Sequence, residues 1–176
     1  MFDPVIFKYQ LRDAVIYWFF IPSAVILTGK GIDSLAGLSP FPERSLLSIG
    51  AFILLITGLF FIWLSMSDLE KAGGTPNPLR PPKKIVTSGS YAVCRHPMFF
   101  GYDLCALSVI LFFRSPGMLC ISFPVFLIFE ILFLRKEEKI LRLKFKQQYA
   151  DYMHNTPFLF PFLLYRKNKC DNHFLK

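Results

Sequence analysis

Charged residues are scarce in this sequence. They make up 18% of its 176 residues, whereas hydrophobic residues make up 53%. A soluble domain of this size needs more charge than this. Residues 45–67 contain no charged side chain, and at 1.5 Å per residue they form about 34 Å of helix, enough to cross a bilayer. The shortage of charge therefore excludes an ordinary soluble domain and predicts an integral membrane protein.

Acidic residues are fewer than basic ones, 12 against 20, which gives a net charge of +8. The excess of lysine and arginine lies in the linker 68–95 and in the segment after residue 134. The positive-inside rule places both segments in the cytosol, with an even number of crossings between them. The loop 30–44 is then outside and the N-terminus inside. A basic cytosolic face suits anionic lipid, and we expect no nucleic-acid partner.

Paired cysteines are missing. The four cysteines, Cys94, Cys105, Cys120 and Cys170, lack the short paired spacing of metal or redox sites. Two of them lie in apolar runs, where cysteine behaves as a small hydrophobic residue. We expect no metal site. The sequence also lacks internal repeats, and residues 1–176 are expected to form a single domain.

Four apolar runs predict about four transmembrane helices, near residues 14–29, 45–67, 99–113 and 115–134. Only Arg-Ser-Pro-Gly at 114–117 separates the last two, which predicts a helical hairpin. The segment 135–152 has a helical period and predicts a cytosolic amphipathic helix after the hairpin. The expected fold class is an all-α integral membrane protein.

Two acids interrupt the apolar runs of the hairpin. Asp103 falls near the start of the third run and Glu130 near the end of the fourth, at similar depth close to one membrane face. A carboxyl group within a span is costly and is a candidate functional group. The alternative is that both side chains merely reach the lipid headgroups.

Polar motifs flank the hairpin at both ends. Arg95-His96-Pro97 directly precedes the third run, and Glu137-Glu138 follows the fourth, so the hairpin brings them to the same membrane face. Further along, an aromatic and aliphatic stripe shares one helix face with the acids: Leu141, Phe145, Tyr149 and Tyr152. The alternative is an amphipathic surface helix whose two glutamates are solvated.

These motifs resemble a known family. The segments are Thr87-Ser88-Gly89-Ser90-Tyr91, Arg95 to Gly101, and Glu137-Glu138 followed by Phe145 and Tyr149-Ala150-Asp151-Tyr152. In order and spacing they are similar to the isoprenylcysteine carboxyl methyltransferases and, more widely, to the phospholipid N-methyltransferases. The resemblance covers roughly residues 73–162. It implies an S-adenosylmethionine-dependent methyltransferase in the membrane.

The resemblance also implies a cofactor region at residues 83–101 and 135–162. In the family, the matching residues line the cofactor site: Lys83, Lys84, Ile85, Val86, Tyr91, His96, Pro97, Met98, Phe99, Glu137 and Glu138. We add Gly101, from the same motif, and Tyr149, whose ring can stack on adenine. Phe99 stands where the family commonly has tyrosine. An arginine shortly before the acidic pair holds the prenyl substrate in the carboxyl methyltransferases, and Arg135 is the nearby candidate.

The chemistry of the donor agrees with these residues. A glutamate of the pair can bind the amino group of S-adenosylmethionine, and Arg95 or His96 its carboxylate. Methyl transfer is a single displacement that needs no protein nucleophile, only alignment in a dry site. A carboxylate acceptor needs a cation, and an amine acceptor needs a group to take its proton. The candidate catalytic residues are Arg95, His96, Glu130 and Arg135.

The sequence thus predicts methyl transfer to a lipid or lipid-like acceptor, either the carboxylate of a prenylated cysteine-like group or a lipid amine. The protein would be multi-pass, in the inner membrane of a bacterium or the endoplasmic reticulum of a eukaryote, with its site facing the cytosol. The alternatives are a membrane reductase of the steroid-reductase type and a non-enzymatic membrane protein. Paired acids suit an ammonium or sulfonium better than the phosphates of a dinucleotide, which disfavours the reductase.

Overall fold

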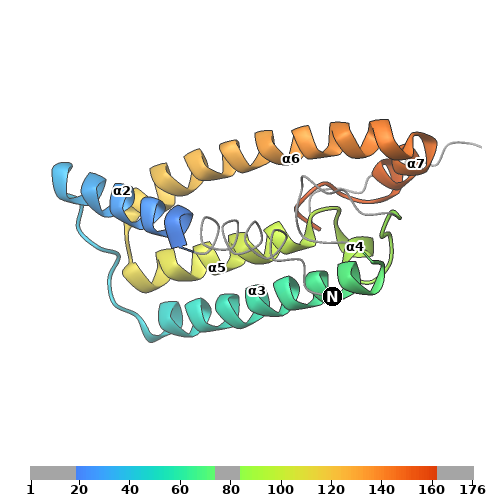
Figure 1. The fold of residues 1–176 in the computed structure, drawn as a ribbon. Helices are drawn as coiled ribbons and strands as arrows, with labels where there is room; N and C mark the ends of the chain where they lie inside the picture. Colours follow the sequence, from blue (N-terminus) through green and yellow to red (C-terminus); the bar gives the residue numbers. More distant parts are fainter. Residues whose placement is uncertain (1–18, 74–83, 162–176) are drawn as a thin grey trace, which may run out of the picture.

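A computed structural model describes residues 19–73 and 84–161 of the chain (Figure 1). The expected start of the first span, the linker 74–83 with Lys83, and the tail from residue 162 lie outside the described residues. All regular elements in the described ranges are helical, in agreement with the expected all-α class. They are α2 (Ile21–Leu35), α3 (Ser45–Lys71), α4 (Ser90–Val93), α5 (Pro97–Phe113), the π-helical turn η2 (Met118–Ser122), α6 (Phe123–Phe145) and α7 (Gln147–Asn155).

Two helices in the described part of the chain are long and apolar enough to cross a membrane. They are α3 and the continuous helix Met118–Phe145, formed by η2 and α6. Only 17% and 22% of their most apolar windows are buried inside the protein, so neither is the covered core helix of a soluble fold. Helix α5 is apolar but shorter. Large apolar side chains therefore cover the outside of the bundle, as lipid contact requires.

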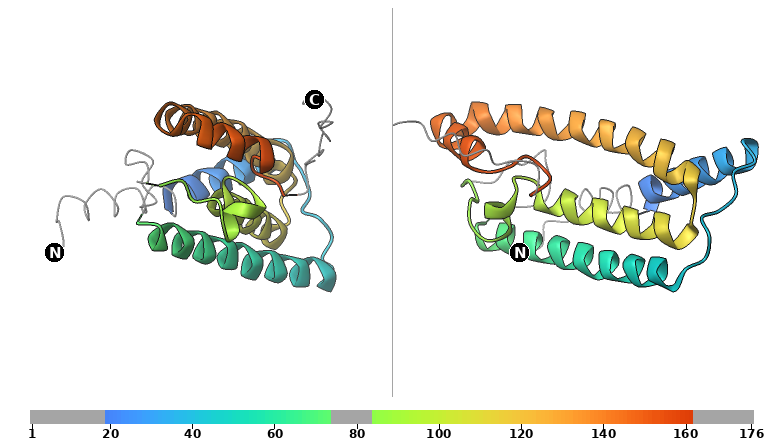
Figure 2. Two further views of the ribbon diagram at one scale, coloured as in Figure 1. Left: turned by 90° about the vertical axis from the view of Figure 1, so that its right-hand side faces the viewer. Right: turned by 180° about the vertical axis from the view of Figure 1, so that it is seen from behind.

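Helices α3 and α5 pack closely along their length (Figures 1 and 2). The face of α3 that meets α5 carries small residues, among them Ala51 and Gly58. Opposite Gly58 lies Gly101 of α5, and a Cβ atom on either glycine would lie 2.6 Å from the carbonyl oxygen of the other. Ser108 of α5 donates a hydrogen bond to the carbonyl of Ala51 at 2.7 Å. Small residues thus let the two backbones approach, as in other membrane helix pairs.

Helix α2 contacts the turn that begins the last long helix. The Gly117 N–H donates to Asp33 Oδ1 at 2.7 Å, and the Ser115 hydroxyl donates to the other carboxylate oxygen. The Met118 N–H in turn donates to Ser115 Oγ at 3.1 Å. Asp33 therefore satisfies a helix N-terminus at the end of the bundle opposite α4 and α7 (Figure 1).

Two local expectations from the sequence are wrong. The first loop does not begin at residue 30, because α2 continues to Leu35 and buries Asp33. The helix after the last apolar run does not continue unbroken to residue 152: α6 ends at Phe145, Lys146 has a φ of 47°, and α7 begins at Gln147. The break turns α7 back toward α4, so that Tyr149 and Tyr152 are buried instead of extending into solvent.

The expected hairpin partners run in opposite directions on either side of residues 114–117 (Figures 1 and 2). However, α5 packs along α3, whereas α6 contacts η2 and α7. The apolar core at the other end of the bundle contains Cys94, Phe100, Leu134 and Leu159. Phe99 and Phe158 pack against this core, and both of their rings contact His96, one of the residues that the sequence predicts to be functional.

Candidate functional site

The segment before α5 is anchored to the end of α3. Both the backbone N–H and the hydroxyl of Ser90 donate to Asp68 Oδ2, each at 2.8 Å. Gly89 has a φ of 63°, and a Cβ atom there would collide with the Asp68 carboxylate. Glycine is the residue that tolerates both this backbone angle and this approach. The anchor fixes α4, and with it the start of the Arg95-His96-Pro97 motif.

Arg95 and His96 connect α4 to α5. His96 precedes the helix with φ −125° and ψ 59°, and Pro97 occupies its first position, where a missing N–H costs nothing. The Arg95 N–H donates to the carbonyl of Pro157 at 2.9 Å. The chain after α7 therefore lies against the motif, and the side chains of Arg95 and His96 both reach Glu138 on α6.

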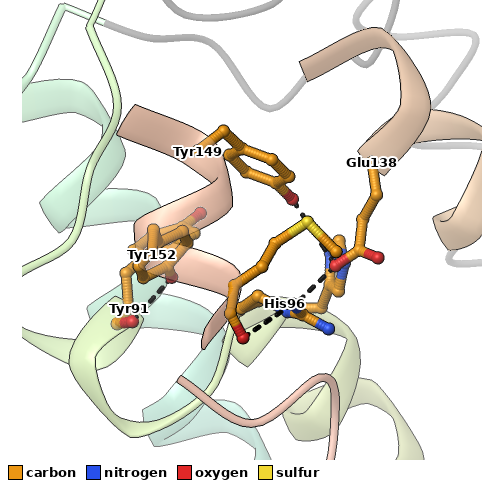
Figure 3. A network of polar contacts seen from close by, with 7 residues as sticks. Tyr91, His96, Glu138, Tyr149 and Tyr152 are labelled. Carbon is orange, nitrogen blue, oxygen red and sulfur yellow. Dashed lines mark hydrogen bonds and ion pairs between the residues drawn. The ribbon is translucent and has the colours of Figure 1, made fainter. Parts of the chain in front are cut away.

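Glu138 is the centre of the polar cluster (Figure 3). Its Oε1 atom lies 2.9 Å from Arg95 Nε, 3.4 Å from His96 Nε2 and 3.5 Å from the Tyr149 hydroxyl, which donates to it. The side chains of Arg95 and Glu138 are each only 10% exposed. All three contacts involve Oε1, and Oε2 takes part in none of them. A charged pair buried to this extent is stable only with such partners.

A second group of contacts surrounds the cluster. Tyr152 donates from its hydroxyl to the carbonyl of Tyr91 at 2.7 Å, and Arg95 Nη1 donates to the carbonyl of Met153 at 3.3 Å (Figure 3). The Arg95 guanidinium lies 5.4 Å from the centre of the Phe158 ring, and the His96 ring lies 5.1 Å from it. Sequence reasoning had not taken Met153 or Phe158 as site residues, and no pattern in the sequence marks them.

Burial shifts the titration of the groups around the cluster. It raises the pKa of Tyr149, Tyr91 and Tyr152 well above the ordinary value for tyrosine, with nearby acids or phenols adding to the effect. Burial also raises the pKa of the Cys94 thiol to about 11. The three phenols therefore stay neutral at physiological pH and act as hydrogen-bond donors and ring surfaces.

The structure brings four of the predicted residues together, namely Arg95, His96, Glu138 and Tyr149. Tyr91 and the half-buried Glu137 are close enough to interact electrostatically with each other. The Phe99 ring packs edge-on against the His96 ring, with 6.4 Å between the ring centres. Of the two glutamates that the sequence indicates, Glu138 receives the ion pair and the hydrogen bonds of the cluster.

Other predicted residues make none of the ion pairs and hydrogen bonds of the cluster given above. Arg135 is exposed on α6, Lys84 is exposed, and Ile85, Val86 and Met98 are half-buried. Pro97 and Gly101 are buried in α5, where Gly101 serves the contact with α3. Glu130 is buried deeper in the bundle, together with Asp103. Lys83 lies outside the described residues.

The cluster fits the head of an amino acid. Such a head needs an anion for its ammonium and N–H donors for its carboxylate; Glu138 offers the first, and Arg95 and His96 offer the second. Arg95 Nε is buried and ion-paired with Glu138 at 2.9 Å, although the contact does not have the geometry of a hydrogen bond. The described residues contain no cluster of three or more metal-ligating side chains.

Two described helices are long and apolar enough to cross a membrane, and a buried charge cluster lies at one end of the bundle, the arrangement expected of a helical membrane protein with a polar site. Residues 46–148, more than half of the chain, match the family model described as phospholipid methyltransferase. The chain belongs to the phospholipid methyltransferase family. It is therefore a membrane methyltransferase, which sets aside the reductase and the non-enzymatic alternatives. No curated protein and no solved structure shows a significant match to the chain.

Proposed function

We propose that this protein transfers a methyl group from S-adenosylmethionine to a lipid or lipid-like acceptor at the cytosolic face of the membrane. The observation that carries the proposal is the buried Arg95–Glu138 pair with His96 and Tyr149, within or directly after the family match. The protein would be multi-pass, with about four spans, both termini in the cytosol, and the α5–α6 hairpin embedded in the membrane.

The amino-acid head of the cofactor would bind at the charge cluster. Glu138 would bind the ammonium through Oε2, and Arg95 and His96 the carboxylate. Tyr91, Phe99 and Tyr149 would supply ring faces for the adenine and for the sulfonium cation. The bound cofactor supplies an activated methyl group. The chain holds its head, aligns the acceptor and excludes water, which together account for most of the rate gain in a one-step displacement.

The shape of the bundle supports a lipid acceptor. The outer faces of α3 and α6 expose large apolar side chains, including Phe52, Trp63, Phe129 and Leu132, while the polar cluster lies at the cytosolic ends proposed for the same helices. A lipid keeps its tail beside these faces while its head meets the methyl group. The acceptor head is either a carboxylate or an amine.

Calorimetric titration of the detergent-solubilised protein with S-adenosylhomocysteine tests the cofactor site. We expect Glu138→Gln and His96→Ala each to weaken binding at least about 30-fold, because each removes a partner of a buried charge-assisted contact. The matched control is Glu43→Gln, which changes a carboxylate whose side chain is 83% exposed and is expected to bind normally. Unchanged affinity in both site variants would mean that the cofactor binds elsewhere.

Transfer of labelled methyl groups tests the acceptor class. The purified protein should label membrane phospholipids or a prenylated cysteine analogue in micelles, and not soluble molecules with the same head groups, such as ethanolamine. Equal turnover of the soluble and the lipidated acceptors would contradict the proposed lateral access from the bilayer, even if the cofactor bound as expected.

A further inference from the structure

Two buried acids in the interior of the bundle have no hydrogen-bond partner among the described residues. Asp103 is 1% exposed and Glu130 is 6% exposed. All four of their carboxyl oxygens lack a hydrogen-bond partner within the described residues. Burying a carboxyl group without a partner is costly, and more so in a membrane. A chain retains such groups when they serve a ligand.

A third buried acid of this protein, Asp33, has a clear structural role. Asp33 is also buried, yet it accepts hydrogen bonds from the Gly117 N–H and from the Ser115 hydroxyl, and so it holds a helix end in place. Asp103 and Glu130 have no comparable role among the described residues. The contrast indicates that their oxygens are kept available for something other than the fold.

Asp103 and Glu130 lie about two helical turns further into the bundle than the charge cluster. Asp103 is seven residues beyond His96 on α5, about 10 Å along the helix. Glu130 is two turns before Glu138 on α6, on the same buried face, with Leu134 between them. The two carboxyl groups are close enough to interact electrostatically. They form a second polar layer on the membrane side of the proposed cofactor site.

We propose that Asp103 and Glu130 form the site that binds the amino group of the acceptor and takes its proton. This inference rests on the proposed methyl transfer and chooses an amine, not a carboxylate, as the acceptor head, since an acidic pair can serve as the counter-ion of an ammonium group and offers a carboxylate no positive charge. An ammonium group donates up to three hydrogen bonds, which the four free oxygens can accept.

The proton step is simple. An amine arrives in the membrane interface as an ammonium ion and in that form has no electron pair for the methyl group. One N–H bond breaks, its proton moves to a carboxylate oxygen of Asp103 or Glu130, and the electron pair stays on nitrogen. The neighbouring acid holds the other N–H groups. The pair thus prepares the nucleophile where a lipid head can reach it.

Carbodiimide coupling tests the amine site without requiring methyl transfer. The full-length protein in micelles is treated with decylamine and an apolar carbodiimide, which takes up the water released when a carboxyl group and an amine form an amide. Mass spectrometry should find decylamide on Asp103 or Glu130 at least about tenfold more often than on the exposed Asp151, because a bound amine is held beside the carboxyl group. Excess decyltrimethylammonium should suppress the adduct, and decanol should not.

The variants complete the test. Asp103→Asn should lower the adduct on Glu130, and Glu130→Gln the adduct on Asp103, whereas Asp151→Asn should change neither. Adduct no more frequent at the two buried acids than at Asp151, or equal suppression by decanol, would overturn the proposal. Specific adduct without any lipid methylation would instead leave the amine site intact and refute the proposed function. Lipid methylation without specific adduct would refute the amine site and leave the proposed function intact.

Discussion

The buried ion pair between Arg95 and Glu138 offers the sharpest test of how this site is built. Each side chain is 10% exposed, and Arg95 Nε lies 2.9 Å from Glu138 Oε1. Removing Glu138 leaves a guanidinium buried without its anion, and breaking such a pair typically costs about 3–5 kcal/mol. We therefore expect Glu138→Ala to lower the free energy of unfolding by about that amount.

A double-mutant cycle isolates the part of this cost that belongs to the pair. Arg95→Met keeps much of the apolar stem and removes the charge, so Glu138→Ala should be much milder in that background. We expect a coupling energy of about 1–3 kcal/mol for the two changes. The measurement is reversible unfolding of the purified protein in mixed micelles, followed by circular dichroism.

The chain contains a matched control for the cycle. Arg114 Nη1 and Glu43 Oε2 also form an ion pair, at 3.4 Å, but their side chains are 35% and 83% exposed. An exposed pair contributes about 0.2–1 kcal/mol, so the same cycle there should give a value in that range. Additive effects at Arg95 and Glu138, with a coupling no larger than that of the control, would refute the reasoning that the site depends on a desolvated pair.

Two further predictions concern packing and pH. Gly58→Ala should lower the free energy of unfolding by about 1–3 kcal/mol, because its Cβ would lie 2.6 Å from the Gly101 carbonyl oxygen. The control Gly50→Ala should be neutral or stabilising, because its Cβ would meet only a leucine methyl at 3.9 Å. Equal losses of stability in the two variants would contradict the close packing of α3 on α5. Since burial raises the pKa of Cys94 from 9.0 to about 11, the folded state should lose stability as the pH rises through this interval, by about 2–3 kcal/mol. Unfolding between pH 8 and 11 should show a smaller loss in Cys94→Ala, and an identical loss would exclude this thiol as a cause.

Much of the helical framework follows from the sequence because it depends on local pattern. The uncharged run 45–67 predicted α3, whose first residue is Ser45 as expected, and the run 99–113 predicted α5 to within two residues. The helix begins at Pro97, two residues before the predicted run, because proline fits the first helical position. The family motifs pointed to Arg95, His96, Glu138 and Tyr149, which the fold gathers into one cluster.

Features that depend on tertiary contact could not be predicted in this way. The break at Lys146 carries no glycine or proline, and what it allows depends on tertiary contacts: Tyr152 reaches the carbonyl of Tyr91 in α4, and Tyr149 reaches Glu138 on α6. Asp33 belonged, by pattern, to an external loop, yet it satisfies the helix end at Gly117. A helical period also cannot distinguish Glu137 from Glu138, since a single residue of rotation decides which of them meets Arg95.

The segment after the break encloses the charge cluster. Pro157 accepts a hydrogen bond from the Arg95 N–H, Met153 accepts one from the Arg95 guanidinium, and the Phe158 ring lies against that guanidinium. In the same segment Tyr149 donates to Glu138, and Tyr152 donates to the carbonyl of Tyr91. The two charges therefore owe much of their burial to a stretch of chain that follows the break at Lys146, and the docking of that stretch sets how much water reaches them.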